Sequence, residues 1–475
     1  MTSDIGIVHL GLGAFHRAHQ AAYVQAYCDR TGDTGWGICA ANLRSNATLV
    51  DDLATADYRY HLVAFSDREH YQINSIDSIQ RTLFSGRDSN GNWGRDLDAL
   101  LEQLSDPSVH IVTLTVTEKG YFLSPAEGRL LTDADDLAAD IKNPQQPRTA
   151  PGILVAALRR RRAADTAPFT VLSCDNMPHN GARTRSAVMQ LAALHDADLA
   201  QWIADEVAFP SSMVDRIVPA MTDAEFERLK TLGIDDHNAV VSEAFTQWVI
   251  EDHFPSGRPD WQEDGVQMVA DVAPFETMKL RLLNGSHSLL AYLGSLAGFE
   301  TVADTVGNAT IRDFLRRYML SEAAPTLSMP EGTDLHDYCD KLLQRFANDS
   351  LNHRLHQIAM DGSQKLPQRW LSGAQEQRQK DADLPCTALG IAAWIRYCQG
   401  VDLAGQSYPV SDPLADDLAQ LHQQHSEVAA LVAAFFAQSA VFPTALAQDS
   451  HFVSQVCECY KALEQTLRFQ QDWPA

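Results

Sequence analysis

The sequence lacks any apolar run long enough to cross a bilayer, because none approaches the roughly 18 to 20 continuous apolar residues that a spanning helix needs. It also lacks a secretory leader: Met1 to Asp4 contain no basic segment, and no cleavable apolar stretch follows them. These two absences predict a cytoplasmic protein with no membrane partner.

Positive charge is scarce. The chain has 37 Lys and Arg against 62 Asp and Glu, which gives a formal net charge of −25. Nucleic acids and anionic membranes are bound by clustered Lys and Arg, so neither is an expected partner. The one basic run, Arg159 to Arg162, follows an apolar stretch and is interpreted as the solvated C-terminus of a helix.

Cysteine spacing gives no sign of a disulfide framework or a zinc site. Eight cysteines are scattered over 475 residues and none forms a Cys-x-x-Cys pair. His16-x-x-His19 resembles a metal motif, but no Cys or carboxylate cluster accompanies it. We therefore expect no metal.

The chain is too long for one ordinary core, so two domains are expected, with residues 1–270 and 271–475 as the prediction. Strand-like runs alternate with helical patterns in the first part, which predicts an α/β, Rossmann-like, doubly wound sheet. The second part carries helix-like apolar spacing and is predicted to be mainly α-helical. The expected strands are 5–10, 36–41, 58–65, 110–116 and 169–173; the expected helices include 16–28, 280–297, 335–346, 388–400 and 415–436.

Gly11-Leu12-Gly13 lies where the first strand should turn into a helix. A dinucleotide needs glycine there, for a tight turn and for close approach of the backbone to the pyrophosphate. The third position of the usual motif is His16, so an ordinary turn is the alternative reading. Phe15, His16 and Arg17 are further candidate cofactor contacts, with Arg17 expected to pair with the pyrophosphate.

The end of the second strand has no Asp or Glu to bind the adenosine ribose, which is the usual mark of NAD preference. Asn42 or Asn46 is available to bond a ribose hydroxyl, whereas Arg44 would tolerate a 2′-phosphate. The residues themselves leave NAD and NADP open.

Four polar residues, Glu276, Lys279, Asn284 and His287, fall within one arc of roughly 140° if the segment is a helix with about 100° per residue. Leu283 and Leu290 share that arc, so the polar groups should be buried and need partners. Hydride transfer with a lysine acid/base fits this pattern: Lys279 would exchange the proton, and Asn284 would stabilise the reacting oxygen. The alternative is a packed helix whose Lys and Asn only cap or bridge.

Taken together, several motifs resemble those of the polyol-specific long-chain dehydrogenase family, which includes mannitol 2-dehydrogenase and fructuronate reductase. They occur in the family's order over about residues 5 to 400 and are highly specific. The matching segments are LGLGAFHRAHQA from Leu10, TVTEKGY from Thr115, FTVLSCDNMPHNG from Phe169, FPSSMVDRIVPA from Phe209, SEAFTQWVIEDHF from Ser242, KLRLLNGSHSLLAYLG from Lys279 and DGSQKLPQR from Asp361.

This resemblance implies a zinc-independent enzyme that uses NAD, with NADP not excluded. It assigns catalysis to Lys279, Asn284 and His287. It also implies that Asn176 is a second amide donor and Glu276 a proton relay, and that Asp215 and Lys365 line the substrate pocket.

Segments from Ala324 and His356 look most like fructuronate reductase, and Gln357 replaces an arginine of the mannitol branch. Both features favour a sugar acid over a neutral polyol, and Lys365 and Arg369 are plausible partners for its carboxylate. The rivals are a mannitol 2-dehydrogenase and a non-catalytic nucleotide-binding protein. The resemblance makes a monomer reasonable and leaves a homo-oligomer open.

Overall fold

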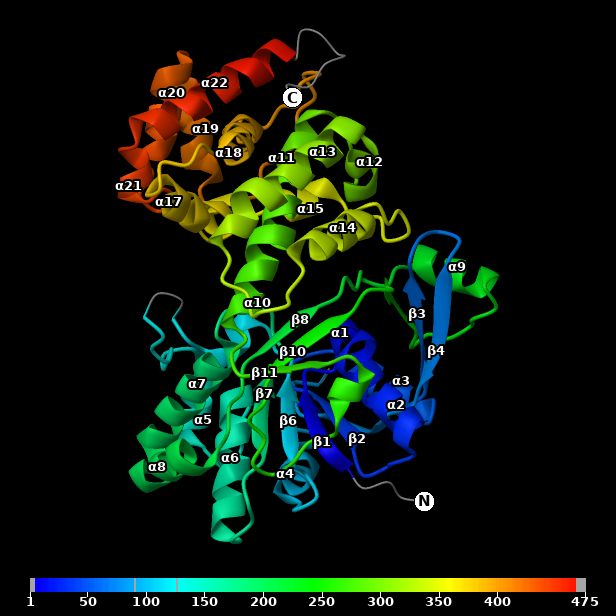
Figure 1. Ribbon diagram of the computed structural model, residues 1–475. Coiled ribbons are helices and arrows are strands. Elements are labelled where there is room, and N and C mark those ends of the chain that lie inside the picture. The colour runs from blue at the N-terminus through cyan, green and yellow to red at the C-terminus, as the bar shows by residue number, and fades with distance from the viewer. Residues whose placement is uncertain (1–4, 89–90, 125–126, 467–475) are drawn as a thin grey trace. The chain divides into compact units, whose positions relative to one another are not determined.

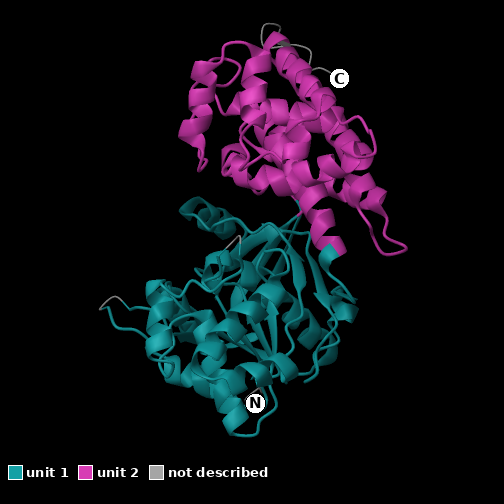
Figure 2. Cartoon of the chain, turned by 90° about the vertical axis from the view of Figure 1, so that its left-hand side faces the viewer, with its two compact units in different colours: residues 1–65, 70–273 teal, residues 66–69, 274–475 magenta. Residues whose placement is uncertain are grey.

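The computed structural model describes residues 5–88, 91–124 and 127–466. The chain divides into two compact units, coloured separately in Figure 2. Unit 1 comprises Met1–Phe65 and His70–Ala273, and unit 2 comprises Ser66–Glu69 and Pro274–Ala475. The short segment Ser66–Glu69 belongs with unit 2, where Arg68 forms an ion pair with Asp349 (Nε to Oδ2, 3.0 Å).

Unit 1 is built on a five-stranded sheet in which all neighbouring strands are parallel. The strand order is β5-β2-β1-β6-β7, which places β1 in the centre, and the strands and their covering helices appear in the lower part of Figure 1. This order is that of a doubly wound dinucleotide-binding fold. The strands are β1 (Ile5–Leu10), β2 (Gly37–Asn42), β5 (Ile79–Phe84), β6 (Ile111–Leu114) and β7 (Thr170–Ser173).

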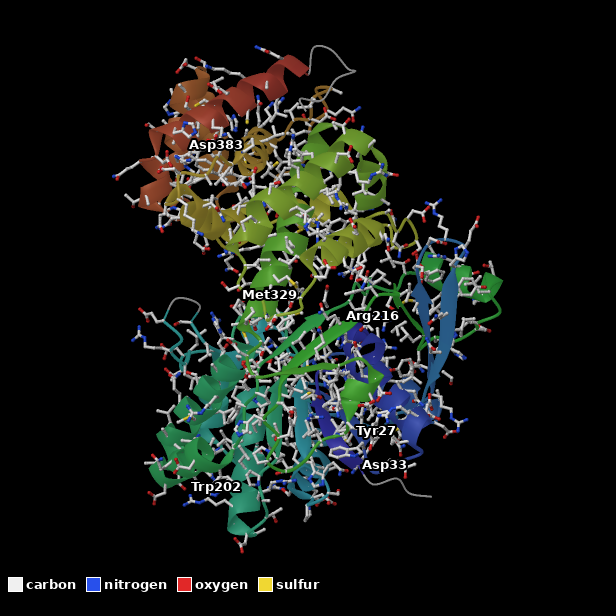
Figure 3. The ribbon with its side chains drawn as sticks, in the orientation of Figure 1. Tyr27, Asp33, Trp202, Arg216, Met329 and Asp383 are labelled. Atoms are coloured by element: carbon white, nitrogen blue, oxygen red, sulfur yellow. The ribbon has the colours of Figure 1, made fainter. Side chains whose placement is uncertain are left out.

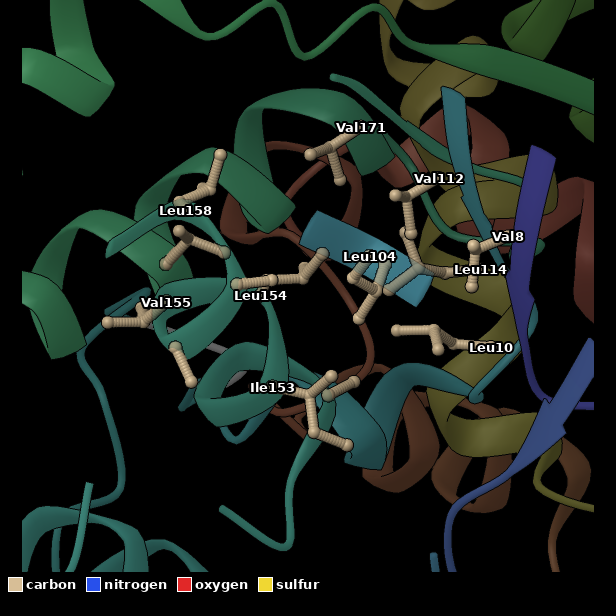
Figure 4. Close-up of a cluster of buried hydrophobic side chains, with 14 of the residues drawn as sticks. Val8, Leu10, Leu104, Val112, Leu114, Ile153, Leu154, Val155, Leu158 and Val171 are labelled. Atoms are coloured by element: carbon tan, nitrogen blue, oxygen red, sulfur yellow. The ribbon is translucent and has the colours of Figure 1, made fainter. Parts of the chain in front are cut away.

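Side chains of these strands alternate between two hydrophobic cores, one on each face of the sheet. In β1, Val8 and Leu10 belong to one core, whereas Ile7 belongs to the other. Figure 4 shows the first core, in which Leu154 and Leu158 of α6 (Ala150–Ala163) lie beside the strand residues. The continuous burial of the strands explains why their sequences read as unbroken apolar runs.

Two three-stranded sheets complete the strands of unit 1. One has the order β11-β10-β8 and the other β4-β3-β9. Their strands are β8 (Ser212–Asp215), β10 (Gln247–Glu251), β11 (Gln267–Val269), β3 (Tyr60–Phe65), β4 (Tyr71–Ile76) and β9 (Val240–Glu243). The helices of this unit are α1 (Ala14–Ala18), α2 (Gln20–Thr31), α3 (Ala47–Thr55), α4 (Leu97–Ser105), α5 (Asp135–Lys142), α6, α7 (Asn180–His195), α8 (Ala197–Glu206) and α9 (Asp223–Thr231).

The expected fold class is confirmed: a doubly wound unit 1 is followed by a helical unit 2. In unit 2, α11 (Gly285–Leu296) is buried along its whole length, α18 (Pro385–Tyr397) is buried from Cys386 onwards, and the two pack against each other. The other helices are α10 (Ala273–Met278), α12 (Val302–Gly307), α13 (Ala309–Arg317), α14 (Leu335–Phe346), α15 (Leu355–Ala359), α16 (Gly362–Leu366), α17 (Ser372–Arg378), α19 (Ala415–Gln424), α20 (Val428–Phe436), α21 (Thr444–Ala447) and α22 (Ser450–Thr466).

Two expected helices are each broken into two. The run from 16 to 28 divides at His19, whose φ of −122° and ψ of −84° are not helical. The run from 415 to 436 divides before Glu427, whose carboxylate accepts a hydrogen bond from the Ala430 N–H and so caps α20. Apolar periodicity continued across both breaks, which is why the sequence pattern did not reveal them.

The interpretation of the basic run as solvated is wrong for Arg161, which is only 2% exposed. Its guanidinium donates hydrogen bonds to the carbonyls of Leu104 and Val109, at 2.8 and 2.7 Å. Burial lowers the pKa of Arg161 to about 10. Arg161 therefore ties α6 to the chain that follows α4, which the sequence alone did not indicate.

In the described part of the chain, no helix combines the length and the apolarity needed to span a membrane.

Candidate active site

The predicted glycine turn connects β1 to α1, and its backbone is tightly enclosed. The N–H of Gly11 donates a hydrogen bond to the Ala41 carbonyl (2.8 Å) at the end of β2. Gly11 has a φ of +110°, and a Cβ atom there would lie 2.1 Å from the Thr115 carbonyl oxygen. Only glycine fits this position. Gly13 is open by contrast, with one atom, the Gly11 carbonyl oxygen, within 4 Å of a Cβ placed there.

A pocket lies beside this turn at the carboxyl ends of β1, β2 and β6, where ligands bind in open α/β sheets. Of the predicted cofactor residues, Gly11, Asn42 and Arg44 line the pocket. The rest of its wall consists of Leu43, Ser45, Thr115, Val116, Thr117, Gly120, Phe122, Asp136, Arg148, Thr149 and Ala150. The combination of a glycine turn, a parallel sheet and a pocket at the strand ends fits a dinucleotide.

Arg17 and His16 do not take the places expected for cofactor contacts. The guanidinium of Arg17 donates to the Asn238 carbonyl and lies 5.6 Å from the centre of the Tyr60 ring. His16 is fully buried and stacks on His9 with ring centroids 3.4 Å apart. Phe15 stacks on His19 at 5.0 Å, and neither Phe15 nor Gly13 is among the pocket residues. Within unit 1, the geometry gives Arg17 a structural role in joining α1 to the chain at Asn238, in place of the expected pyrophosphate contact.

The second strand ends without an acidic residue, as the sequence indicated. Asp33, which precedes that strand, accepts a hydrogen bond from the Tyr27 hydroxyl at 2.8 Å, and both residues are labelled in Figure 3. Its carboxylate is therefore engaged at the start of β2, away from the pocket at the strand's end. The Arg44 side chain is largely exposed. Its Nη2 lies 3.9 Å from Oδ2 of Asp136, and both residues line the pocket.

Asp175 was missed by sequence reasoning, although it precedes the predicted Asn176. Its carboxylate accepts hydrogen bonds from the N–H groups of Val116 and Thr117, at 3.0 and 2.8 Å, and from the Tyr121 hydroxyl at 2.6 Å. Thr117 has φ +64° and ψ 161°, a conformation that non-glycine residues rarely adopt. Asp175 thus holds a strained turn of the pocket wall and fixes the chain beside Asn176.

Asp215, another predicted substrate residue, is the last residue of β8 and is buried. Asn176 follows β7 in the Ser-Cys-Asp-Asn segment and has an exposed side chain. Both residues belong to unit 1. The signal that could have found Asp175 is its position in the same segment, two residues after the buried strand β7 ends.

In unit 2, the segment expected to be an α-helix opens into a π-helical turn. α10 is followed by η3 (Lys279–Asn284), which has π-helical hydrogen bonding, and then by α11. π-helical bonds join residues five apart, so Lys279 and Asn284 lie one above the other on the same side. The predicted common face therefore exists, but with a different geometry from the assumed 100° per residue. Such turns occur frequently at functional sites.

His287 lies one turn beyond Asn284 and is 7% exposed. Its Nε2 is buried and makes no hydrogen bond within the part of the chain that the structure describes. Burial lowers the pKa of His287 well below its usual value, and the neighbouring His353, Arg369, Arg345 and Lys279 lower it further. The imidazole is therefore neutral at pH 7, with a free nitrogen available to a ligand.

Arg369 is held next to η3 and α11 by hydrogen bonds, whereas Lys365 is bonded to the chain that precedes its own helix. Arg369 donates from Nη1 to the Ser288 hydroxyl (2.9 Å) and to the Asn284 carbonyl (3.2 Å). Lys365 donates from Nζ to the carbonyls of Met360 and Ile358, at 2.5 and 3.2 Å. Burial, together with the positive charge of Arg369, lowers the pKa of Lys365.

The structure thus brings Lys279, Asn284, His287 and Arg369 together in unit 2, with Glu276 one turn before Lys279 on α10. Arg345 and His353 belong to the same group but were not predicted, since each lies in a segment without a recognisable motif. Among the described residues, no group of three or more His, Cys, Asp or Glu side chains is arranged to hold a metal.

A doubly wound dinucleotide fold in one unit and a buried lysine with amide and imidazole neighbours in the other define an oxidoreductase. Comparison with known families agrees. Residues 5–263 match the mannitol dehydrogenase Rossmann domain, and residues 271–464 match the mannitol dehydrogenase C-terminal domain. The chain belongs to the mannitol dehydrogenase family, and the expected family membership is confirmed.

Individual relatives are similar over almost the whole chain. The chain is 45% identical over 460 residues to D-mannonate oxidoreductase of Escherichia coli strain K12, covering 96% of this chain and 93% of the relative. It is 38% identical to mannitol 2-dehydrogenase of Phaeosphaeria nodorum, covering 97% and 79%. Among solved structures, Pseudomonas fluorescens mannitol 2-dehydrogenase in a ternary complex with NAD and D-mannitol is 38% identical, with a TM-score of 0.81 and coverage of 100% and 95%.

Proposed function

We propose that this enzyme reduces the keto carbon of D-fructuronate to give D-mannonate and catalyses the reverse oxidation, with NAD(H) as its cofactor. Unit 1 is the proposed dinucleotide-binding domain, and unit 2 is the proposed substrate-binding and catalytic domain. The observation that carries the choice of substrate is the cluster of positive charge around His287.

This cluster is well suited to a carboxylate. Besides burial, the neighbours that lower the pKa of His287 are His353 and the positively charged side chains of Arg369, Arg345 and Lys279. Positively charged groups that lie close together in a buried site repel one another, which costs free energy. An anion bound among them reduces that cost. A uronate supplies such an anion, whereas a neutral polyol does not. Arg369, with its planar guanidinium, is the proposed partner of the carboxylate, and Lys365 lies beside it.

The fit of NAD rests on the pocket of unit 1. Gly11 and Asn42 line this pocket, and in the proposal the backbone at Gly11 meets the pyrophosphate and Asn42, at the end of β2, meets the ribose hydroxyls. The solved relative from Pseudomonas fluorescens was obtained with NAD. When bound, the cofactor supplies or accepts the hydride. Arg44 also lines the pocket, so the comparison of NADH with NADPH belongs in the first experiment.

The proton chemistry is assigned to residues of this chain. Lys279 gives its ammonium proton to the oxygen that becomes the hydroxyl, and takes it back in the oxidation direction. The amides of Asn284 and Asn176 donate hydrogen bonds that stabilise negative charge on that oxygen. Neutral His287 orients the substrate through Nε2, Asp215 lines the substrate site, and Glu276, one turn before Lys279, relays the proton towards water.

A neutral polyol such as D-mannitol is the second candidate, because mannitol 2-dehydrogenases are 38% identical to the chain. A substrate panel separates the two. NADH oxidation would be followed with D-fructuronate, D-fructose and related ketoses, each also with NADPH. We expect kcat/KM for fructuronate to exceed that for fructose by roughly 30- to 150-fold, since a buried carboxylate contact contributes roughly 2–3 kcal/mol. A preference for fructose would contradict the proposal.

The role of Lys279 is tested by Lys279→Ala. Loss of a general acid/base lowers kcat by roughly 10²- to 10⁴-fold, while NADH affinity should change little because the cofactor pocket lies in unit 1. The measurements are steady-state kinetics and quenching of NADH fluorescence. Full turnover by this variant would refute the assignment.

A further inference from the structure

In its described residues unit 2 contains three π-helical turns, η3, η4 (Tyr318–Ala323) and η6 (Pro367–Leu371), and η3 packs against each of the other two. π-helical turns are rare and are mostly seen as single turns within α-helices. At η3 the hydrogen bonding changes from the α-helical to the π-helical register: the Gly285 N–H donates to the Leu280 carbonyl, five residues earlier instead of four. A change of register leaves backbone carbonyls without their ordinary α-helical donors, and buried carbonyls need others.

Side chains from η4 and η6 supply those donors. The Tyr318 hydroxyl donates a hydrogen bond to the Arg281 carbonyl at 2.9 Å. The Trp370 indole N–H donates to the Gly285 carbonyl at 3.1 Å. Tyr318 and Trp370 are each 2% exposed, so water does not replace either bond easily. Together the two bonds clamp the π-helical turn between Lys279 and His287.

Gly285 provides a separate observation for the same arrangement. A Cβ atom at this position would lie 2.3 Å from the Tyr318 hydroxyl oxygen and 3.4 Å from the Trp370 Nε1. Gly285 therefore lets the Tyr318 ring reach the backbone of the turn, and the Trp370 ring lies at ordinary contact distance beside it. The glycine follows Asn284 directly in sequence, so the requirement falls inside the catalytic segment itself.

We propose that Tyr318 and Trp370 are positioning residues of the reaction: their hydrogen bonds hold η3 in the π-helical register that places Lys279 and Asn284 on one side. This inference rests on the proposed function, because it gives these two side chains their importance. Neither ring contacts the reacting atoms; each acts through the backbone of the turn.

The test is Tyr318→Phe and Trp370→Phe, with Tyr397→Phe as the matched control. Tyr318→Phe and Tyr397→Phe each remove one buried hydroxyl in unit 2, but Tyr397 interacts through its hydroxyl with His356 rather than with η3. We expect kcat to fall roughly 10- to 100-fold in the two test variants, because small displacements of catalytic groups have effects of that size. NADH affinity should stay within twofold in all three variants, and the control should keep its kcat.

A double-mutant cycle distinguishes positioning from general loss of structure. If Tyr318 acts through Lys279, then Tyr318→Phe should have almost no further effect on the residual activity of Lys279→Ala. An equal loss in both backgrounds, or a kcat within twofold of the wild type in Tyr318→Phe, overturns the inference. Thermal melting of each variant shows that the folded protein is being compared.

Gly285→Ala gives an independent check, since its Cβ would displace the Tyr318 ring and should lower kcat at least as much as Tyr318→Phe. The kinetics use whichever substrate the wild-type enzyme turns over best. If the wild type reduces no sugar acid or ketose, or if Lys279→Ala is fully active, the proposed function has failed. If the wild type is active, Lys279→Ala is inactive and Tyr318→Phe is normal, only the positioning inference has failed.

Discussion

At the residue scale, Gly11 and Gly13 carry different constraints although they belong to the same turn. Gly11 has both a positive φ and a carbonyl oxygen 2.1 Å from the place of a Cβ, whereas Gly13 has neither. We expect Gly11→Ala to lower the melting temperature and to abolish NADH binding. Gly13→Ala should keep the wild-type melting temperature, because its Cβ would meet only the Gly11 carbonyl oxygen at 3.8 Å, and the glycine motif predicts that it lowers NADH affinity by crowding the pyrophosphate.

Differential scanning fluorimetry and NADH fluorescence titration measure the two effects separately. Equal destabilisation by both substitutions would show that the difference in packing has no consequence for folding. Unchanged NADH affinity in Gly13→Ala would show that the pyrophosphate does not approach this residue.

At the scale of elements, the turn after β6 depends on one buried carboxylate. Asp175 accepts hydrogen bonds from two consecutive N–H groups, Val116 and Thr117, and the second of these residues has a conformation that costs about 1–3 kcal/mol. Asp175→Asn leaves a single acceptor oxygen for these two N–H groups and the Tyr121 hydroxyl. We expect the turn to relax and the dissociation constant of NADH to rise about tenfold, since Thr117 lines the pocket.

Glu322→Gln is a matched control for this substitution. Its carboxylate also accepts from two consecutive N–H groups and one hydroxyl, at the start of α18 in unit 2. Both variants should lose stability, but only Asp175→Asn should lose NADH affinity. Thr117→Gly in the Asp175→Asn background should recover part of that affinity, because glycine adopts the strained conformation without cost. Failure of both expectations would show that Asp175 does not act through Thr117.

The same elements show what sequence reasoning reached. The central strands were predictable because each is a short apolar run bounded by turn residues, and burial on both faces of the sheet produces that pattern. Gly11 was identified by its position between strand and helix. Lys279, Asn284 and His287 were proposed to share a face, and the structure places them together, although through a π-helical turn rather than through regular α-helical spacing.

What the sequence did not reveal depends on long-range contacts. The π-helical register of η3 is supported by Tyr318 and Trp370, which lie 37 and 85 residues away in sequence from the carbonyls that they bond. The sequence pattern suggested that Arg17 was free to bind a ligand and that Arg161 was exposed to solvent. Both side chains are buried, and each donates a hydrogen bond to a backbone carbonyl. A linear pattern records residue type and spacing, so it does not show which carbonyl will meet a buried guanidinium.

At the scale of the whole molecule, each unit carries buried histidines that the fold keeps neutral. Burial lowers the pKa of His9 to about 3, and it lowers the pKa values of His16 and His287 well below the ordinary value. His9 and His16 belong to unit 1 and His287 to unit 2. In the unfolded chain these imidazoles titrate near the ordinary histidine pKa of about 6.5. Both units are therefore expected to share one dependence of stability on pH.

The sign follows from proton counting. Between pH 6.5 and the lowered native pKa, the unfolded state binds protons that the native state does not bind, so acid favours unfolding. Each such histidine contributes up to about 1.4 kcal/mol per pH unit below 6.5 and nothing well above it. Urea unfolding at pH 7.5, 6.5 and 5.5 should show a free energy of unfolding that is constant at first and then falls.

His16→Gln should reduce the slope of the free energy of unfolding against pH, below pH 6.5, by the equivalent of about one proton. This expectation holds whatever the substitution does to stability at pH 7.5. Tyr23→Phe, a buried change in the same unit, should keep the wild-type slope, because burial raises the pKa of Tyr23 beyond this range. Identical slopes for the wild type and His16→Gln would contradict this prediction. They would mean that His16 binds the same number of protons in the native and the unfolded state.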